Sequence, residues 1–137
     1  MASKAGLVLR AEQAMEDGGR LIVAVIDDDE AVRDSLRFLL ETAGFAVDTF
    51  ASACQFLAAP VTHPRFCLLV DQHMPHLTGL DLLRRLHDNG QMPRVALMTG
   101  SPSEDLTRQA LELGVVAVLE KPLAEESLFG FVSYFSR

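Results

Sequence analysis

The sequence predicts an α/β fold, a single doubly wound sheet of five parallel strands covered by five helices. Short apolar runs rich in β-branched residues alternate with segments whose apolar residues recur at helical spacing. The connections between them are short, so the strands must be joined by right-handed crossovers. The chain has 137 residues, of which 49% are hydrophobic and 23% charged, and this suits one globular domain.

The first half of the chain supplies two strands and two helices. Residues 21–27 form an apolar run that ends in three aspartates, as expected for a strand buried on both faces. Residues 31–43 place apolar side chains at helical spacing and stop before a glycine, which favours a helix C-terminus. Residues 45–50 alternate as a strand, and Ser52 can cap a short helix that ends by Pro60.

The second half repeats the alternation three times. Each strand is an apolar run, and each helix begins or ends at a capping residue such as serine, asparagine or glycine. The strands are expected at 66–71, 95–99 and 115–120, and the helices at about 80–89, 103–113 and 125–134.

The N-terminal residues indicate where the domain begins, and the cysteines indicate the cellular compartment. Residues 1–20 lack the long apolar run of a signal peptide, so we expect a flexible N-terminal extension there and the domain at 21–137. No stretch approaches the roughly 20 apolar residues that span a bilayer, and no membrane association is predicted. Cys54 and Cys67 lie in apolar patterns without CxxC spacing, which predicts buried free thiols and a cytoplasmic protein.

The charge balance argues against nucleic-acid binding. Lys and Arg number 12 against 19 Asp and Glu, which gives a net charge of -7, and Lys4 and Lys121 are the two lysines. The sequence therefore has no basic patch for phosphate backbones. The excess of carboxylates raises the question of what neutralises them.

Polar side chains follow four of the predicted strands. They are Asp27, Asp28 and Asp29 after the first strand, Asp71 after the third, Thr99 and Gly100 after the fourth, and Lys121 after the fifth. The carboxyl ends of parallel strands meet at one edge of a sheet, so these groups should converge. Clustered carboxylates without imidazole or thiolate suit Mg²⁺. An aspartate screened in this way can attack phosphorus, with a lysine ammonium and a hydroxyl to stabilise the transferred group.

Four segments carry a resemblance to a known family. VAVIDDDEAVRDSL, LLVDQHMPHLTG, VALMTG and VLEKP occur in the order found in receiver domains of two-component response regulators, and the central one fits D-x-x-M-P-x-x-x-G. The sequence resembles this family from Leu21 to Phe135 and is most similar to its FixJ-like subgroup. The resemblance implies a flavodoxin-like sheet with strand order 2-1-3-4-5.

The resemblance also implies a role for each site residue. Asp71 would be the phosphoacceptor, and Mg²⁺ would be held by Asp27, Asp28, Asp71 and the backbone carbonyl of His73. Thr99, Gly100 and Lys121 would contact the phosphoryl group, and Lys121-Pro122 would be a cis peptide. Val118 stands where the family usually has an aromatic residue, so the aromatic part of the family's switch cannot operate in the usual way.

The implied partners are a sensor histidine kinase or a phosphotransfer domain as donor, and a downstream protein effector. Phosphorylation would change the face formed by residues 103–113, 115–120 and 125–134, with homodimerisation through that face as a hypothesis. Since no effector is predicted before Arg137, we expect a stand-alone receiver or part of a longer regulator.

Two alternatives remain open at this point. A haloacid-dehalogenase-like phosphatase would use Asp27 as its nucleophile, but it leaves Asp71 and the M-P-x-x-x-G run unexplained. A degenerate receiver would keep the fold and serve only as a binding module. In the favoured interpretation the protein is a phosphoacceptor that assists its own phosphorylation and dephosphorylation, and is not an enzyme in the usual sense.

Overall fold

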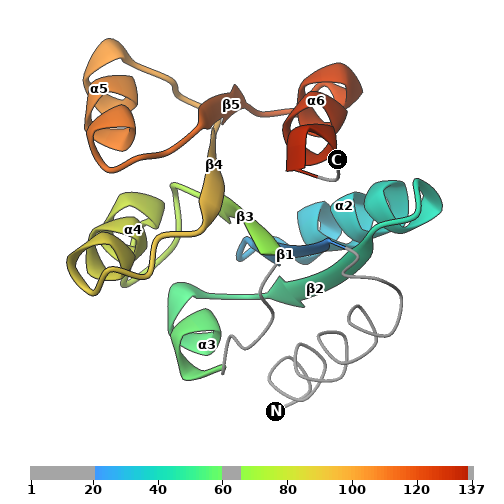
Figure 1. Cartoon of the computed structure of the whole chain (residues 1–137), viewed down its shortest axis with the longest axis horizontal. Coiled ribbons are helices and arrows are strands. Elements are labelled where there is room, and N and C mark those ends of the chain that lie inside the picture. Colours follow the sequence, from blue (N-terminus) through green and yellow to red (C-terminus); the bar gives the residue numbers. More distant parts are fainter. Residues whose placement is uncertain (1–20, 60–65, 136–137) are drawn as a thin grey trace.

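A five-stranded parallel sheet forms the centre of the molecule (Figure 1). The computed structural model describes residues 21–59 and 66–135, and the predicted extension at 1–20 lies outside this part of the chain. The strands are β1 (Ile22–Ile26), β2 (Ala46–Phe50), β3 (Phe66–Asp71), β4 (Arg94–Thr99) and β5 (Ala117–Glu120). They pair in the order β2-β1-β3-β4-β5, which confirms the predicted topology.

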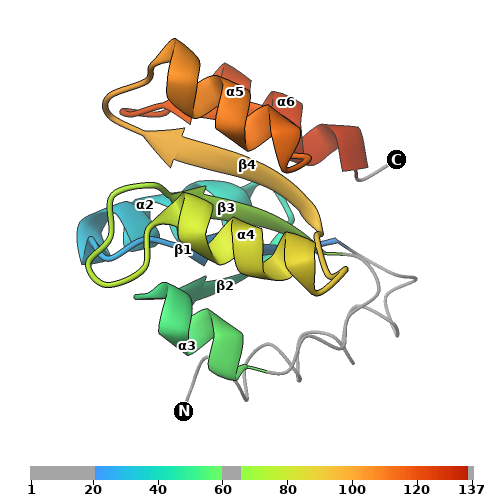
Figure 2. The same ribbon diagram turned by 90° about the vertical axis from the view of Figure 1, so that its left-hand side faces the viewer.

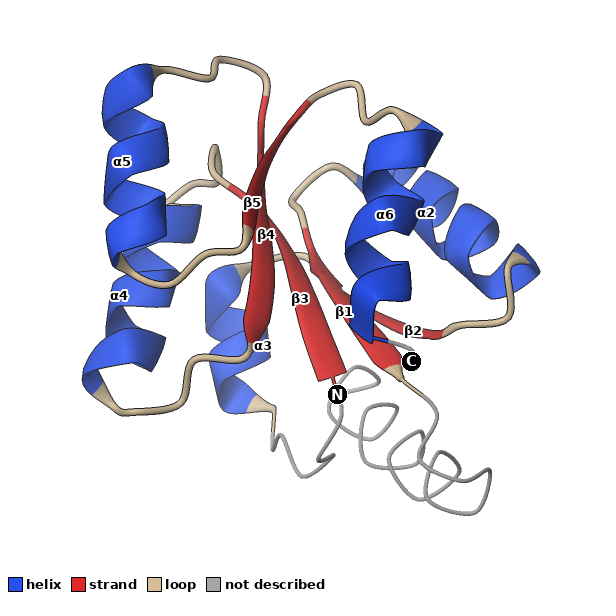
Figure 3. Ribbon diagram, turned by 45° about the horizontal axis from the view of Figure 1, so that its top comes forward, coloured by secondary structure: helices blue, strands red, loops and turns tan. Residues whose placement is uncertain are grey.

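Helices cover both faces of this sheet. They are α2 (Glu30–Thr42), α3 (Ala53–Ala58), α4 (Gly79–Asp88), α5 (Glu104–Glu112) and α6 (Glu125–Phe135). Figures 2 and 3 show α2 and α6 on one face and α3, α4 and α5 on the other. The doubly wound architecture is therefore confirmed, and the predicted ends of the elements lie within about two residues of the observed ones.

The central strand β1 explains why its sequence is apolar at every position. Ile22, Ala24 and Ile26 pack into the core beneath α3, α4 and α5, whereas Val23 and Val25 pack beneath α2 and α6. All five residues are fully buried. A parallel strand covered on both faces has no solvent side, so it shows no alternation of apolar and polar residues.

Side-chain caps fix where several helices start after the strands. Asp29 accepts a hydrogen bond from the Ala31 N–H over 2.9 Å, as expected for an aspartate that caps the following helix. Thr78 and Asp81 form a reciprocal capping box at the start of α4. These caps set the loops that carry the polar groups at the carboxyl edge of the sheet.

The prediction that both cysteines are buried is wrong for Cys54. Cys67 is buried in β3, where burial raises the pKa of its thiol to about 12. Cys54 is exposed because α3 has only six residues and buries Ala53 and Phe56 instead. Neither thiol is in a disulfide within the described residues. Among the helices that the structure describes, none is long and apolar enough to cross a membrane.

Candidate functional site

Three carboxylates meet at the carboxyl edge of the sheet. One oxygen each of Asp27, Asp28 and Asp71 lies within 4.8 Å of the others. Asp27 is fully buried and Asp71 is 3% exposed, whereas Asp28 faces solvent. Because β1 and β3 are neighbours in the sheet, residues that directly follow or end them must lie side by side. The predicted convergence of these aspartates is therefore what the structure shows.

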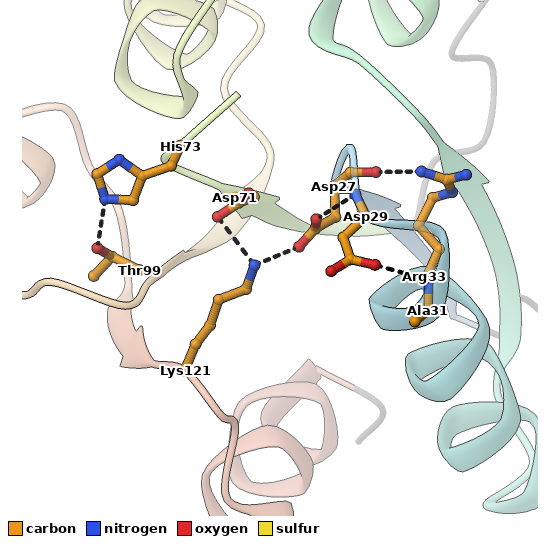
Figure 4. A network of polar contacts seen from close by, with 8 residues as sticks. All are labelled: Asp27, Asp29, Ala31, Arg33, Asp71, His73, Thr99 and Lys121. Atoms are coloured by element: carbon orange, nitrogen blue, oxygen red, sulfur yellow. Dashed lines mark hydrogen bonds and ion pairs between the residues drawn. The ribbon is translucent and has the colours of Figure 1, made fainter. Parts of the chain in front are cut away.

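Lys121 reaches the two buried carboxylates from the end of β5. Its Nζ lies 2.7 Å from Oδ2 of Asp27 and 3.2 Å from Oδ1 of Asp71 (Figure 4). The Lys121 backbone N–H donates to the Thr99 carbonyl over 2.8 Å, and the Lys121-Pro122 peptide is cis, as the resemblance implies. The single described lysine is thus the counter-charge inside the acidic pocket.

The pocket shifts the titration of Asp71 and Lys121. Burial raises the pKa of Asp71 above its ordinary value, and the charge of Asp27 raises it further, while Lys121 opposes both effects. For Lys121, burial lowers the pKa, but its hydrogen bond to Asp27 and the charges of both aspartates outweigh burial and raise it overall. The charge of Asp27 therefore disfavours ionisation of Asp71, and a cation between the two carboxylates relieves that repulsion.

The donor set fits a hard divalent cation. Carboxylate oxygens, one of them solvent-exposed, are available without thiolate or imidazole in the cluster. Two of the three carboxylates are buried close together, which makes the pocket more acidic than one lysine neutralises. Mg²⁺, which takes oxygen ligands and retains waters, matches this chemistry.

Thr99 and Gly100 lie beside this pocket at the end of β4. The Thr99 side chain is fully buried, and its hydroxyl accepts a hydrogen bond from the Ser101 N–H over 3.0 Å. The same hydroxyl lies 3.3 Å from Nε2 of His73, a contact drawn in Figure 4. Around the place where a Cβ on Gly100 would stand, no described residue other than Gly100 and its two neighbours has an atom within 4 Å. The end of β4 therefore offers a hydroxyl at Thr99 and free space at Gly100.

The motif glycine that follows Asp71 has a steric reason. A Cβ on Gly79 would lie 2.7 Å from the Asp71 carbonyl oxygen and 2.7 Å from Cδ1 of Leu97. The Gly79 N–H also donates to the Gln72 carbonyl over 3.2 Å. Only glycine lets α4 start this close to the end of β3. The M-P-x-x-x-G spacing thus sets the loop that follows the candidate phosphoacceptor.

Comparison with known proteins assigns the sequence to a family. Residues 23–133 match the family described as response regulator receiver domain. The chain is 44% identical over 112 residues to the transcriptional regulatory protein FixJ of Azorhizobium caulinodans, covering 82% of this chain and 53% of that protein. The FixJ protein of Bradyrhizobium diazoefficiens is 40% identical, with 80% and 54% covered.

The chain belongs to the response regulator receiver domain family. Its fold also matches the crystal structure of FixJ-N, with a TM-score of 0.76, 33% identity and coverage of 85% of this chain and 93% of that one. The response regulator StyR gives a TM-score of 0.79 and 32% identity, with 85% and 59% covered. These matches do not favour a haloacid-dehalogenase-like phosphatase with Asp27 as nucleophile. This receiver spans about half the length of the curated relatives it matches.

Val118, for which the resemblance implied an aromatic switch position, lies in β5, three residues before Lys121. It is partly buried and packs against the core on the side of α3, α4 and α5. A valine has no ring that could turn between an inward and an outward position.

Three side-chain contacts at the site were not predicted from the sequence. The Arg33 guanidinium donates to the Asp27 carbonyl over 2.7 Å, the Gln72 side chain accepts from the Leu80 N–H over 2.9 Å, and the His73 imidazole meets Thr99. Arg33 holds the end of β1, and Gln72 caps the start of α4. Their spacing follows no residue pattern, so the sequence held no signal for these contacts.

Proposed function

We propose that Asp71 of this receiver domain accepts a phosphoryl group from the phosphohistidine of a sensor histidine kinase or a phosphotransfer domain in the cytoplasm. The observation that carries the proposal is the position of Lys121, whose ammonium contacts both Asp27 and Asp71 in the pocket. A partly buried lysine that already faces the acceptor carboxylate can pair with a phosphoryl group attached there. The family membership of the chain supports the same reaction.

The chemical step needs little beyond positioning and charge. A carboxylate oxygen of Asp71 forms a bond to phosphorus while the bond from phosphorus to the donor histidine nitrogen breaks, and its electron pair stays on that nitrogen. Asp71 must be ionised to attack, and Lys121 favours the ionised form against the effects of burial and of Asp27. Once the phosphoryl group is attached, the Lys121 ammonium pairs with its negatively charged oxygens.

Asp27, Asp28, Asp71 and the backbone carbonyl of His73 would hold Mg²⁺ in this receiver. When bound, the metal ion supplies positive charge that screens the phosphoryl oxygens from the carboxylates. The exposed Asp28 gives the pocket a carboxylate that can be hydrated, which suits an ion that retains waters. Arg33 and the Asp29 N–H hold Asp27 in place through its carbonyl and its Oδ1.

Thr99 and Gly100 would complete the phosphoryl site. The Thr99 hydroxyl can donate its proton to a phosphoryl oxygen, and the open space at Gly100 leaves room for the group and for its own N–H to donate. Thr99 is the last residue of β4, the neighbour of β3 in the sheet, and Gly100 directly follows it. Their place beside Asp71 supports roles in binding the transferred group.

The output would run through the face formed by α5, β5 and α6. Leu111 and Val116 on this face are 55% and 46% exposed, so it carries apolar surface that a partner can cover. Phe131, by contrast, is buried in the core, and Val118 is partly buried. We assign this face to a downstream protein effector or to a second copy of the phosphorylated chain.

The decisive experiment is phosphorylation by acetyl phosphate with Mg²⁺, followed by intact mass and peptide mapping. We expect the mass of one phosphoryl group on Asp71, removed by Asp71→Asn and kept in a control Asp88→Asn, whose side chain is 80% exposed on α4. Labelling that survives Asp71→Asn but is lost in Asp27→Asn would support a phosphatase-like nucleophile at Asp27 instead. The absence of any mass gain would leave a receiver that acts only as a binding module.

A further inference from the structure

The Thr99 hydroxyl needs a partner for its proton. Thr99 is fully buried, so solvent does not serve this group. One lone pair of Oγ1 already accepts the Ser101 N–H over 3.0 Å. The proton of a buried hydroxyl is almost always hydrogen-bonded, because leaving it unpaired is unfavourable. An acceptor must therefore lie within reach of Oγ1.

His73 provides that acceptor. Its Nε2 lies 3.3 Å from Oγ1 of Thr99, where an unprotonated ring nitrogen can accept the hydroxyl proton (Figure 4). A neutral imidazole carries its proton on one ring nitrogen and accepts on the other. Because the buried hydroxyl needs an acceptor, it favours the tautomer of His73 in which Nδ1 carries the proton and Nε2 accepts. The β3–α4 loop and the end of β4 are then joined by a side-chain hydrogen bond.

This bond and phosphoryl binding compete for the same proton. Phosphoryl oxygens only accept hydrogen bonds, so Thr99 can serve them only with its single hydroxyl proton. The Ser101 N–H keeps one lone pair of the same oxygen occupied. Thr99 therefore cannot donate to His73 and to a phosphoryl group on Asp71 at the same time.

We propose that His73 is a positioning residue that holds the Thr99 hydroxyl proton in the unphosphorylated receiver and loses it when a phosphoryl group arrives on Asp71. This inference rests on the proposed function of Asp71. Since Val118 has no ring to respond to Thr99, His73 is the ring whose hydrogen bonding changes with phosphorylation. The His73 side chain is exposed, so this change occurs on the surface beside the site.

Binding of beryllofluoride, a phosphoryl mimic, in the presence of Mg²⁺ tests the competition. His73→Ala should bind beryllofluoride about fivefold more tightly than the wild type. The wild type must break the hydrogen bond between Thr99 and His73 when beryllofluoride binds, whereas the variant has no such bond, and the factor corresponds to one ordinary hydrogen bond. His73→Gln, whose amide oxygen can reach the hydroxyl, should restore wild-type affinity. His87→Ala on α4, whose ring contacts Asp88 instead, should leave affinity unchanged. Unchanged or weaker binding by His73→Ala would overturn the proposal.

Ring ¹⁵N NMR provides a second measurement that a purely structural role would not move. His73 should show an unprotonated Nε2, and its signal should shift when beryllofluoride and Mg²⁺ are added together but not with Mg²⁺ alone. Thr99→Val should abolish that shift. A protonated Nε2, or bound beryllofluoride without a His73 response, would overturn this inference alone. Failure of beryllofluoride to bind at all would overturn the proposed function as well.

Discussion

Nζ of Lys121 lies 2.7 Å from Oδ2 of Asp27, so that the end of β5 is tied to the end of β1 across the carboxyl edge of the sheet. The two strands are not neighbours, since β3 and β4 separate them. The ion pair therefore spans the site in which Asp71 lies and contributes to both its charge balance and its shape.

Replacement of Lys121 by methionine should destabilise the fold. Lys121→Met leaves two buried carboxylates without their counter-charge, and removing one partner of a fully buried pair lowers the free energy of unfolding by roughly 3–5 kcal/mol. We expect about 2 kcal/mol here, because 23% of the Lys121 side chain is exposed. Urea denaturation at neutral pH without divalent metal measures it. The loss should shrink in an Asp27→Asn background, and an equal loss in both backgrounds would refute the role of the pair.

Asp71→Asn should stabilise the protein in a pH-dependent manner. Burial and Asp27 raise the pKa of Asp71 in the folded state above 3.8, so its ionised form opposes folding. Well below pH 3.8 Asp71 is protonated in both states, and variant and wild type should be equally stable. As the pH rises through the folded pKa, the variant should gain on the order of 1 kcal/mol, as other substitutions in functional sites do.

Asp81 provides a control of opposite sign for this measurement. Hydrogen bonds from the backbone and the hydroxyl of Thr78 lower the pKa of Asp81, so its ionised form favours the folded state. Asp81→Asn should therefore lose stability as the pH rises, where Asp71→Asn gains it. Urea titrations from about pH 2.5 to pH 8, which span the region below 3.8 where Asp81 titrates and the region above it where Asp71 does, compare the two, and parallel profiles would contradict the assignment of the pKa shifts.

Gly79→Ala should disturb both stability and phosphorylation. Its Cβ would lie 2.7 Å from backbone and side-chain atoms, and overpacking of this kind lowers the free energy of unfolding by about 1–3 kcal/mol. Gly130→Ala in α6 is the matched control. Apart from its chain neighbours and the nearby backbone of α6, no described atom lies within 4 Å of its new Cβ, and alanine is the better helix former by up to about 1 kcal/mol. Thermal denaturation should show opposite signs, and equal effects would contradict the steric explanation of the motif glycine.

Gly100→Ala should separate function from stability. The added methyl group would meet open space, so the melting temperature should change little. If that space receives the phosphoryl group, acetyl phosphate should label Asp71 at least several-fold more slowly. Rates of mass gain with Mg²⁺, together with a melting curve, test both statements. Normal labelling by a folded variant would show that the space at Gly100 is not needed for the phosphoryl group.

The fold could be predicted because the apolar runs, the polar residues that follow them and the order of the strands all indicate the same parallel sheet. The apolar run from Leu21 to Ile26 requires a strand covered on both faces, and the aspartates that follow it must lie at the carboxyl edge. The convergence of Asp27, Asp71 and Lys121 follows from strand order alone. Backbone topology thus determined the main part of the site.

The details that escaped prediction depend on side-chain direction. The contacts of Arg33, Gln72 and His73 arise where loops and helix ends meet in three dimensions, and no spacing in the sequence encodes them. Cys54 was predicted to be buried because it lies in an apolar stretch, but a helix of six residues buries only one narrow stripe. Periodicity is informative over several turns and weak over one or two.

The tight junction between Gly79 and the Asp71 carbonyl has a mechanical consequence. α4 starts against β3 with no room for even a methyl group, and the Gln72 side chain and carbonyl fasten the same junction by hydrogen bonds. The chain segment that carries Asp71 is therefore a stiff base. The segment after Thr99 has free space at Gly100. If Asp71 is phosphorylated as proposed, we expect the added charge to be accommodated by displacement on the β4 side. Because the β3–α4 junction is tight and the segment after β4 is open, α5 would move and α4 would stay in place.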